Sequence, residues 1–217
     1  MSVLLCAATG MEVAQTVQLM AKQNFSGKVD LLITGVGLMA TTYALTRQII
    51  QKKPAIIIQA GISGCIDEKL NLGDVVVVKD EVIGDMGVME NKSFKTLFDL
   101  NLMHKDDQPW NNGKLVNTNK NLLLSSGLKQ VHAVTVHEIT THPKRIHYYK
   151  ETLHAQIEHM EGAALHFVGL MEDIPFLQIR SVSNQVSVRD KSVWKLDESI
   201  DNLNQEVQRI ISQLILE

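Results

Sequence analysis

The sequence has few cysteines, no long apolar run and little net charge, and each shortage excludes a class of protein. Its 217 residues include only Cys6 and Cys65, which lack metal-ligand spacing and are too few for a disulfide scaffold. No apolar stretch is long enough to cross a bilayer, and the start MSVLLCAATGMEV lacks the basic flank of a signal peptide. The net charge of −3 argues against a general nucleic-acid or membrane-surface binder. We therefore expect a protein of the reducing cytoplasm with no nucleic-acid and no membrane partner.

Sequence signatures of metal and phosphate sites are also missing. The 8 histidines form no HExxH or similar pair, so a metal site is not expected. The glycine turn GVG lacks the third glycine of a dinucleotide fingerprint, and no Gly-Lys-Ser/Thr follows any glycine turn. We expect neither a metal nor a cofactor.

Short apolar runs alternate with helical patterns in the first part of the chain. Strands are expected at 2–8, 29–37 and 54–64, with helices at 11–22 and 38–53 between them. This alternation implies a mainly parallel sheet covered by helices. The remaining expected elements are strands at 73–85, 130–139, within 155–172 and at 175–186, a long excursion with a short helix at 86–113, and a helix from Asp197 onward. Since no repeat or flexible linker is visible, a single domain over residues 1–217 is expected.

Polar and glycine-rich segments stand where the expected strands end, which is where ligands bind in α/β sheets. They are Glu12, TGVG (34–37), QAGISG (59–64), EHMEG (158–162) and RSVSN (180–184). Each also has an ordinary structural interpretation. Glu12 suits the first turn of a helix, and Asn184 suits a turn after a strand. Glu161 could be such a first-turn acid too, but its small apolar neighbours argue against that interpretation.

In combination these motifs are more specific. The order GMEV, TGVG, QAGISG, LGDVVV, HMEGAA and IRSVSN resembles the nucleoside phosphorylase/nucleosidase superfamily over nearly the whole chain. The resemblance implies the α/β nucleoside phosphorylase-like fold, with a central mixed, mainly parallel, twisted sheet flanked by helices. It also implies a small-molecule nucleoside substrate, ribose hydroxyls bound by Glu161, and Met160 lying against the sugar. The small residues 162–164 would leave room for the ribose.

The attacking group distinguishes a hydrolase from a phosphorylase. A phosphorylase holds phosphate with cations, usually arginines in the first glycine loops. This chain has no arginine before Arg47, which falls inside an expected helix. Glu12 stands where the hydrolase branch of the superfamily keeps the carboxylate that activates water. We therefore expect water as the nucleophile.

The last expected strand bears on the leaving base. Adenine-specific nucleosidases of the superfamily end this strand with Arg-x-x-Ser-Asp, whereas this chain has RSVSN and thus Asn184. An amide nitrogen donates, which suits the O6 and N7 acceptors of a 6-oxopurine such as hypoxanthine. The amide oxygen could instead accept from the base. In either case Asn184 assists the departure of the base by hydrogen bonding and does not deliver a full proton to it.

Two further segments, the excursion FKTLFDLNL…QPWNNG and the tail SNQVSVRDKSVW, resemble those of the futalosine hydrolases within that superfamily. That branch hydrolyses futalosine to hypoxanthine and dehypoxanthine futalosine in menaquinone biosynthesis. The aryl carboxylate at the 5′ end of futalosine would need apolar walls and a cation. Candidate walls are Ile62, Ile139 and the excursion 86–113. Candidate cations are His137, Arg189 and Lys191, although a solvated surface charge is the favoured interpretation of each.

Other roles and alternatives follow from the same resemblance. Gly61 and His159 are expected at the substrate. Arg180 is expected behind the site, orienting an acid such as Glu161 or Glu12, with a direct contact to the substrate as the other expectation. Members of the family usually form dimers or larger oligomers, so the resemblance implies a homo-oligomer. Three alternatives stay open: an adenine-specific nucleosidase acting on methylthioadenosine, S-adenosylhomocysteine or aminodeoxyfutalosine, a purine nucleoside phosphorylase, and a nucleoside-binding module without catalysis.

Overall fold

The computed structural model describes residues 2–22 and 27–216, so positions 1, 23–26 and 217 of the expected domain lie outside the described residues. The strands are β1 (Val3–Ala7), β2 (Val29–Ile33), β3 (Ile56–Cys65), β4 (Val75–Ile83), β5 (Gly87–Glu90), β6 (Ser93–Thr96), β7 (Leu115–Val116), β8 (Lys129–Thr135), β9 (Ile157–His159) and β10 (Phe176–Gln185). The helices are α1 (Gly10–Lys22), α2 (Leu38–Gln51), α3 (Lys120–Ser125), α4 (Pro143–Glu151), α5 (Gly162–Met171) and α6 (Leu196–Leu216), with a 3₁₀ turn at Lys191–Val193.

The main sheet is mixed and mainly parallel, as predicted. Its eight strands follow the order β10-β4-β8-β9-β3-β1-β2, with β7 beside β4. Parallel pairs join β2, β1, β3 and β10, and also β4, β8 and β9. Antiparallel pairs join β10 to β4, β9 to β3 and β7 to β4. Because β10 pairs with both β3 and β4, five strands close into a ring from which β1 and β2 extend, whereas the sequence reasoning had treated the sheet as open.

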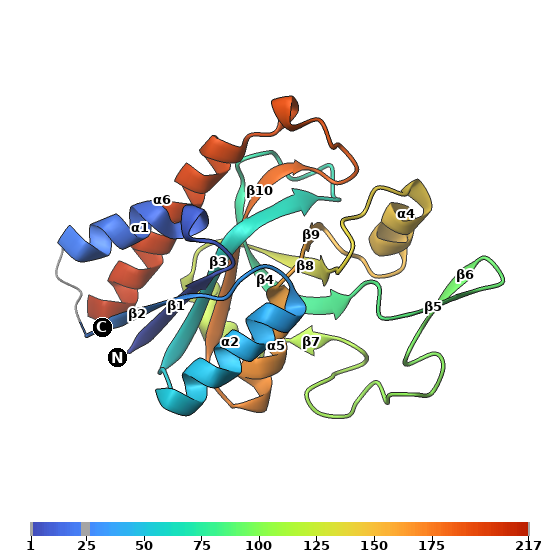
Figure 1. The fold of residues 1–217 in the computed structure, drawn as a ribbon, viewed down its shortest axis with the longest axis horizontal. Coiled ribbons are helices and arrows are strands. Elements are labelled where there is room, and N and C mark those ends of the chain that lie inside the picture. Colours follow the sequence, from blue (N-terminus) through green and yellow to red (C-terminus); the bar gives the residue numbers. More distant parts are fainter. Residues whose placement is uncertain (1, 23–26, 217) are drawn as a thin grey trace.

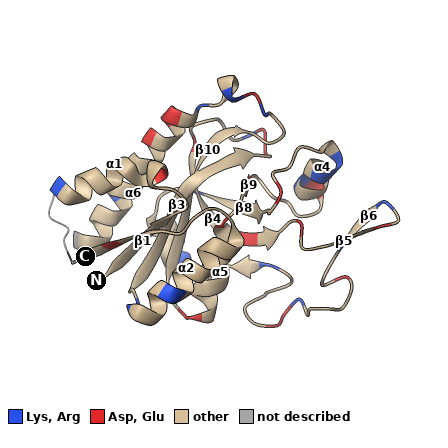
Figure 2. Cartoon of the chain, viewed as in Figure 1, with Lys and Arg blue, Asp and Glu red and all other residues tan. Residues whose placement is uncertain are grey.

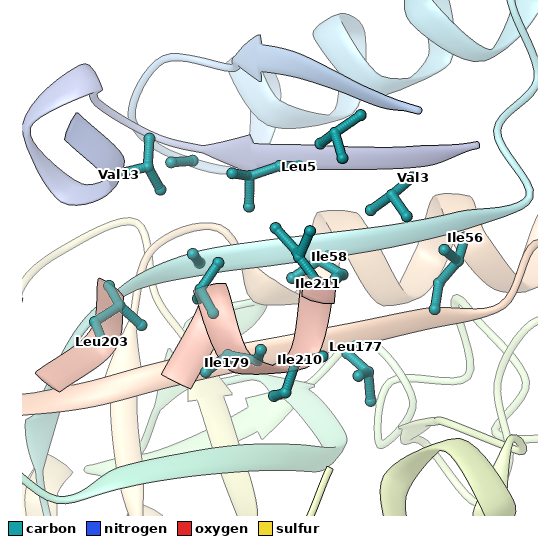
Figure 3. Close-up of a cluster of buried hydrophobic side chains, with 14 of the residues drawn as sticks. Val3, Leu5, Val13, Ile56, Ile58, Leu177, Ile179, Leu203, Ile210 and Ile211 are labelled. Carbon is teal, nitrogen blue, oxygen red and sulfur yellow. The ribbon is translucent and has the colours of Figure 1, made fainter. Parts of the chain in front are cut away.

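Helices cover the sheet on two sides (Figure 1). Helices α1 and α6 lie together on one side, and α2 and α5 pack together on the other. Helix α6 repeats apolar residues at helical spacing, and Figure 3 shows its Leu203, Ile210 and Ile211 directed at β3 and β10. Burying each such side chain stabilises the fold by about 1.5–3 kcal/mol.

Three local features differ from the sequence-based expectations. The excursion 86–113 contains no helix; it forms the β5–β6 hairpin, which projects away from the sheet, followed by turns. Helices α3 and α4 were not expected, because both are short and α4 is strongly polar. Strand β10 carries a bulge, since Val182 pairs with Ser63 and Asn184 with Gly64, which leaves Ser183 as the extra residue.

Charged side chains are concentrated on helices and loops, while the central strands are largely uncharged (Figure 2). Within the described residues, no helix is both long enough and apolar enough to span a membrane.

Candidate active site

Glu12 is held by three hydrogen-bond donors at the junction of β1 and α1. The Thr9 amide and hydroxyl donate to Oε2 over 2.9 and 3.0 Å, and the Ile62 amide donates to Oε1 over 3.2 Å. These donors come from the end of β1 and from β3, so the strand register fixes the carboxylate. Glu12 is buried, yet it lines the cavity described below. A fixed carboxylate in this position can accept a proton from a water molecule.

Glu161 lies between two structural supports. Its Oε1 accepts from the Gly37 amide over 3.1 Å, and its Oε2 accepts from Arg180 Nη1 over 3.5 Å. The fully buried Arg180 also donates through Nη2 to Gln59 Oε1 over 3.0 Å. Arg180 therefore lies behind the site and orients an acid, as the sequence reasoning expected of its position.

Gly61 makes room for this arginine. A β-carbon at Gly61 would collide with Arg180 Nη1 and would lie 3.0 Å from Glu12 Oε1. Neither Gly61 nor Arg180 lines the cavity. Gly61 leaves room for Arg180, and Arg180 contacts Glu161. A direct contact of either residue with the substrate stays a prediction.

His159 also differs from its expected role. Its backbone position borders the cavity, but its imidazole is only 2% exposed and faces the buried Glu81, with 2.7 Å between Nε2 and Oε1. The Gly162 amide donates to Nδ1 over 3.2 Å, so the ring proton is on Nε2. Burial by itself would raise the pKa of Glu81, but the neighbouring His159 holds that pKa below its usual range. His159 thus anchors the start of α5 and does not present its ring to a substrate.

Asn184, Gly64 and Glu158 lie opposite one another on the neighbouring strands β10, β3 and β9. Asn184 Oδ1 accepts from the Ser183 hydroxyl over 2.9 Å, and Nδ2 donates to the Gln185 carbonyl over 2.9 Å. Glu158 Oε1 accepts from the Thr140 amide over 3.0 Å. Burial raises the pKa of Glu158, against the lowering effect of Thr140. The sequence analysis did not identify Glu158 or Thr140. For Glu158 a signal was available: consecutive residues of a strand point to opposite faces of the sheet, so Glu158 and His159 cannot both face the same side.

A cavity of about 330 Å³ joins these groups, a volume suited to a small organic ligand. Its wall includes most of the predicted site residues: Glu12, Ile62, Ile139, His159, Met160, Glu161 and Asn184. Among the described residues of the wall, Arg189 is the only lysine or arginine, and it stacks 5.4 Å from the Trp194 ring. Lys191 is not part of the wall, and His137 is paired with Asp85 over 3.1 Å.

The excursion 86–113 does not contribute to this cavity within the described chain. Its Met89 and Phe94 line a second cavity of about 560 Å³, which shares Ile139 and Thr140 with the first. The described ranges also contain no group of three or more His, Cys, Asp or Glu side chains arranged to hold a metal ion.

Comparisons with known proteins identify related enzymes. A futalosine hydrolase of Thermus thermophilus is 25% identical over 185 residues, 84% of this chain and 80% of the relative. A 5′-methylthioadenosine/S-adenosylhomocysteine nucleosidase of Maridesulfovibrio salexigens is 23% identical over 200 residues, 88% of this chain and 82% of the relative. These homologues are nucleoside-cleaving hydrolases, in agreement with the sequence-based expectation of an N-glycosidase.

The fold is also that of solved nucleosidases. A 5′-methylthioadenosine/S-adenosylhomocysteine nucleosidase from S. pneumoniae, solved with the transition-state inhibitor MT-ImmA, superposes with a TM-score of 0.80 at 16% identity, covering 99% of this chain and 100% of the other. The predicted nucleoside phosphorylase-like α/β fold is therefore confirmed. The family model described as the phosphorylase superfamily matches residues 24–216. This chain belongs to the phosphorylase superfamily.

Proposed function

We propose that this chain is an N-glycosidase, a single domain over residues 1–217 that cleaves a purine nucleoside with water as the nucleophile. The observation that carries the proposal is the placement of Glu12 and Glu161 in the wall of one cavity, each oriented by fixed donors. Among the described residues, a wall with three acids, Glu12, Glu158 and Glu161, and a single arginine disfavours a phosphate nucleophile, because phosphate recognition uses clustered cations. A phosphorylase is therefore the weaker alternative.

In the proposed reaction, the water oxygen bonds to C1′ while the C1′–N9 bond breaks and its electron pair goes to the base. Glu12 takes the proton of the water as general base. Glu161 accepts hydrogen bonds from the ribose hydroxyls, and Met160 packs on the sugar. Asn184 stabilises the charge that develops on the leaving base by donating from its amide.

We further propose that the substrate is futalosine, cleaved to hypoxanthine and dehypoxanthine futalosine for menaquinone biosynthesis. Two observations support this choice: Asn184 in the cavity wall, with an amide that suits a 6-oxopurine, and the similarity to the Thermus thermophilus enzyme. The similarity to the Maridesulfovibrio salexigens nucleosidase supports an adenine-specific activity as the second candidate.

A homo-oligomer in the cytoplasm remains part of the proposal. Several apolar side chains at and beside the cavity mouth are largely exposed, with 66% of Met11, 58% of Val36 and 82% of Met39 accessible. A partner copy covering them would remove this apolar surface from water. Light scattering coupled to size-exclusion chromatography should give a mass of at least two chains, and a monomer mass would contradict this proposal.

The decisive experiment is chromatographic detection of the base released from four nucleosides, each with and without phosphate. They are futalosine, inosine, aminodeoxyfutalosine and methylthioadenosine. Hypoxanthine from futalosine without phosphate is the expected result. Adenine release would assign the enzyme to the second candidate, and strict phosphate dependence would overturn hydrolysis.

A further inference from the structure

Glu158 is a buried acid for which the proposed mechanism has no role. It is 5% exposed, lines the same cavity as Asn184, and has one oxygen, Oε1, bound by the Thr140 amide. Its other oxygen, Oε2, is buried and has no hydrogen-bond partner among the described residues. A buried carboxylate oxygen without a donor is costly, so this position calls for a donor from a ligand.

The strand register sets where that donor must be. Gly64 pairs with Asn184 of β10 on one side and with Glu158 of β9 on the other. Neighbouring strands lie about 4.8 Å apart, so the two outer residues are separated by about 9–10 Å across the strand between them. A β-carbon on Gly64 would lie 2.9 Å from Val186 Cγ2 and 3.5 Å from Asn184 Nδ2, so the glycine lets these two side chains lie close above β3. A flat base with one hydrogen bond at each side matches this separation.

We propose that Glu158 determines base specificity by accepting the N1–H of a 6-oxopurine, while Asn184 donates to O6 or N7 on the other side of Gly64. The inference rests on the proposed function, since it takes the cavity to hold a purine nucleoside. Hypoxanthine carries a proton on N1, whereas adenine presents a lone pair there. An ionised Glu158 therefore attracts the first base and repels the second.

The Thr140 amide makes the Glu158→Gln variant informative. This backbone donor needs an acceptor, so the glutamine must keep its oxygen at Thr140 and turn its amide nitrogen toward the base. That nitrogen is a donor, so it cannot bind the N1–H donor of hypoxanthine, but it can donate to N1 of adenine. We expect kcat/KM for hypoxanthine release from inosine or futalosine to fall about 10- to 100-fold, and adenine release from adenosine or aminodeoxyfutalosine to rise.

Glu151→Gln is the matched control, since it makes the same chemical change on the exposed surface of α4. This variant should keep the wild-type ratio of hypoxanthine to adenine release. If Glu158→Gln also keeps that ratio while the wild type is active, the inference is wrong and the proposed nucleosidase function stands.

A measurement on the wild-type protein decides the matter even if the variant does not fold. Calorimetry should show that 1-methylhypoxanthine binds at least about tenfold more weakly than hypoxanthine, because the methyl group replaces the N1 proton. Equal affinity for the two bases, or binding of neither, overturns the inference. Discrimination between the bases by a protein that hydrolyses none of the nucleosides would support the inference and remove the proposed function.

Discussion

At the residue scale, the geometry of Glu12 gives the most direct prediction. Glu12→Gln keeps one oxygen, which can accept from the two Thr9 donors that now bind Oε2, but it can no longer take a proton from water. We expect kcat to fall about 10²- to 10⁴-fold with KM little changed, which is the usual size of a general-base contribution.

Steady-state hydrolysis and calorimetry with hypoxanthine would test this prediction together. The variant should still bind the base, because the proposed base contacts are made by Asn184 and Glu158 and not by Glu12. Full turnover by the variant would exclude Glu12 as the water-activating group.

Single side chains also show the limits of sequence reasoning. The motifs place Glu12, Met160 and Glu161 after expected strands, and all three line the cavity. They did not indicate which way the His159 ring points. Strand β9 has only three residues, too few for an alternating pattern that separates a cavity-facing side chain from one directed at Glu81.

At the scale of elements, α6 holds the helix that carries Glu12. The buried Asn204 accepts from the Thr16 amide over 2.9 Å and from its hydroxyl over 2.7 Å. It also donates to the Glu12 carbonyl over 2.9 Å. We expect Asn204→Ala to lower the free energy of unfolding by about 1–3 kcal/mol, because buried donors and an acceptor lose their partner.

Urea unfolding measures the stability change, and kcat should fall as well, since the backbone of Glu12 loses an anchor. The exposed Gln205 on the same helix offers a control: Gln205→Ala should leave both quantities close to wild type. A destabilised Asn204→Ala variant with unchanged kcat would mean that α6 supports α1 without influencing Glu12.

Helix α5 carries a titratable group, His166, that is fully buried. Its Nδ1 donates to the Leu115 carbonyl over 2.9 Å, and burial lowers its pKa below the ordinary 6.5. As the pH falls below that value, this histidine takes up a proton in the unfolded chain but not in the folded protein. The free energy of unfolding must therefore fall as the pH falls. The slope from this residue can reach about 1.4 kcal/mol per pH unit.

His166→Phe should therefore make the loss of stability between about pH 7 and pH 5 shallower, whatever its effect at neutral pH. Urea unfolding at a series of pH values gives the slope. The exposed His104 provides the comparison, because His104→Phe should retain the wild-type slope. Equal slopes for all three proteins would show that folded His166 takes up protons as readily as the unfolded chain.

At the scale of the whole molecule, the two cysteines report on global opening. Cys6 and Cys65 are both buried, and burial raises their thiol pKa values to about 12 and about 11. Since the thiolate is the reactive form, a disulfide reagent at about pH 8 should label the native protein at least 100-fold more slowly than the protein in concentrated urea.

The absorbance change of the reagent gives the labelling rate. The Cys65→Ser variant gives the rate of Cys6 alone. Rapid labelling of the native protein would mean that the core between β1 and β3 opens easily. It would also conflict with the packing around these strands.

The closed ring of strands is the part of the fold that the sequence did not predict. Apolar periodicity indicates where strands occur, but the pairing of β10 with both β3 and β4 joins segments about a hundred residues apart in sequence. The β5–β6 hairpin was missed for a related reason, since its exposed residues lack an alternating apolar pattern. The proposed covering of the cavity mouth by a partner copy has no sequence signal of its own either.

The bulge at Ser183 makes base recognition depend on chain length as well as on residue type. Deleting Ser183 would restore regular pairing, with Val182 still opposite Ser63 and Asn184 still opposite Gly64. Asn184 would, however, lose the Ser183 hydroxyl that donates to its Oδ1. The length of this strand, with Glu158 and Asn184 unchanged, would therefore decide how firmly the base is held.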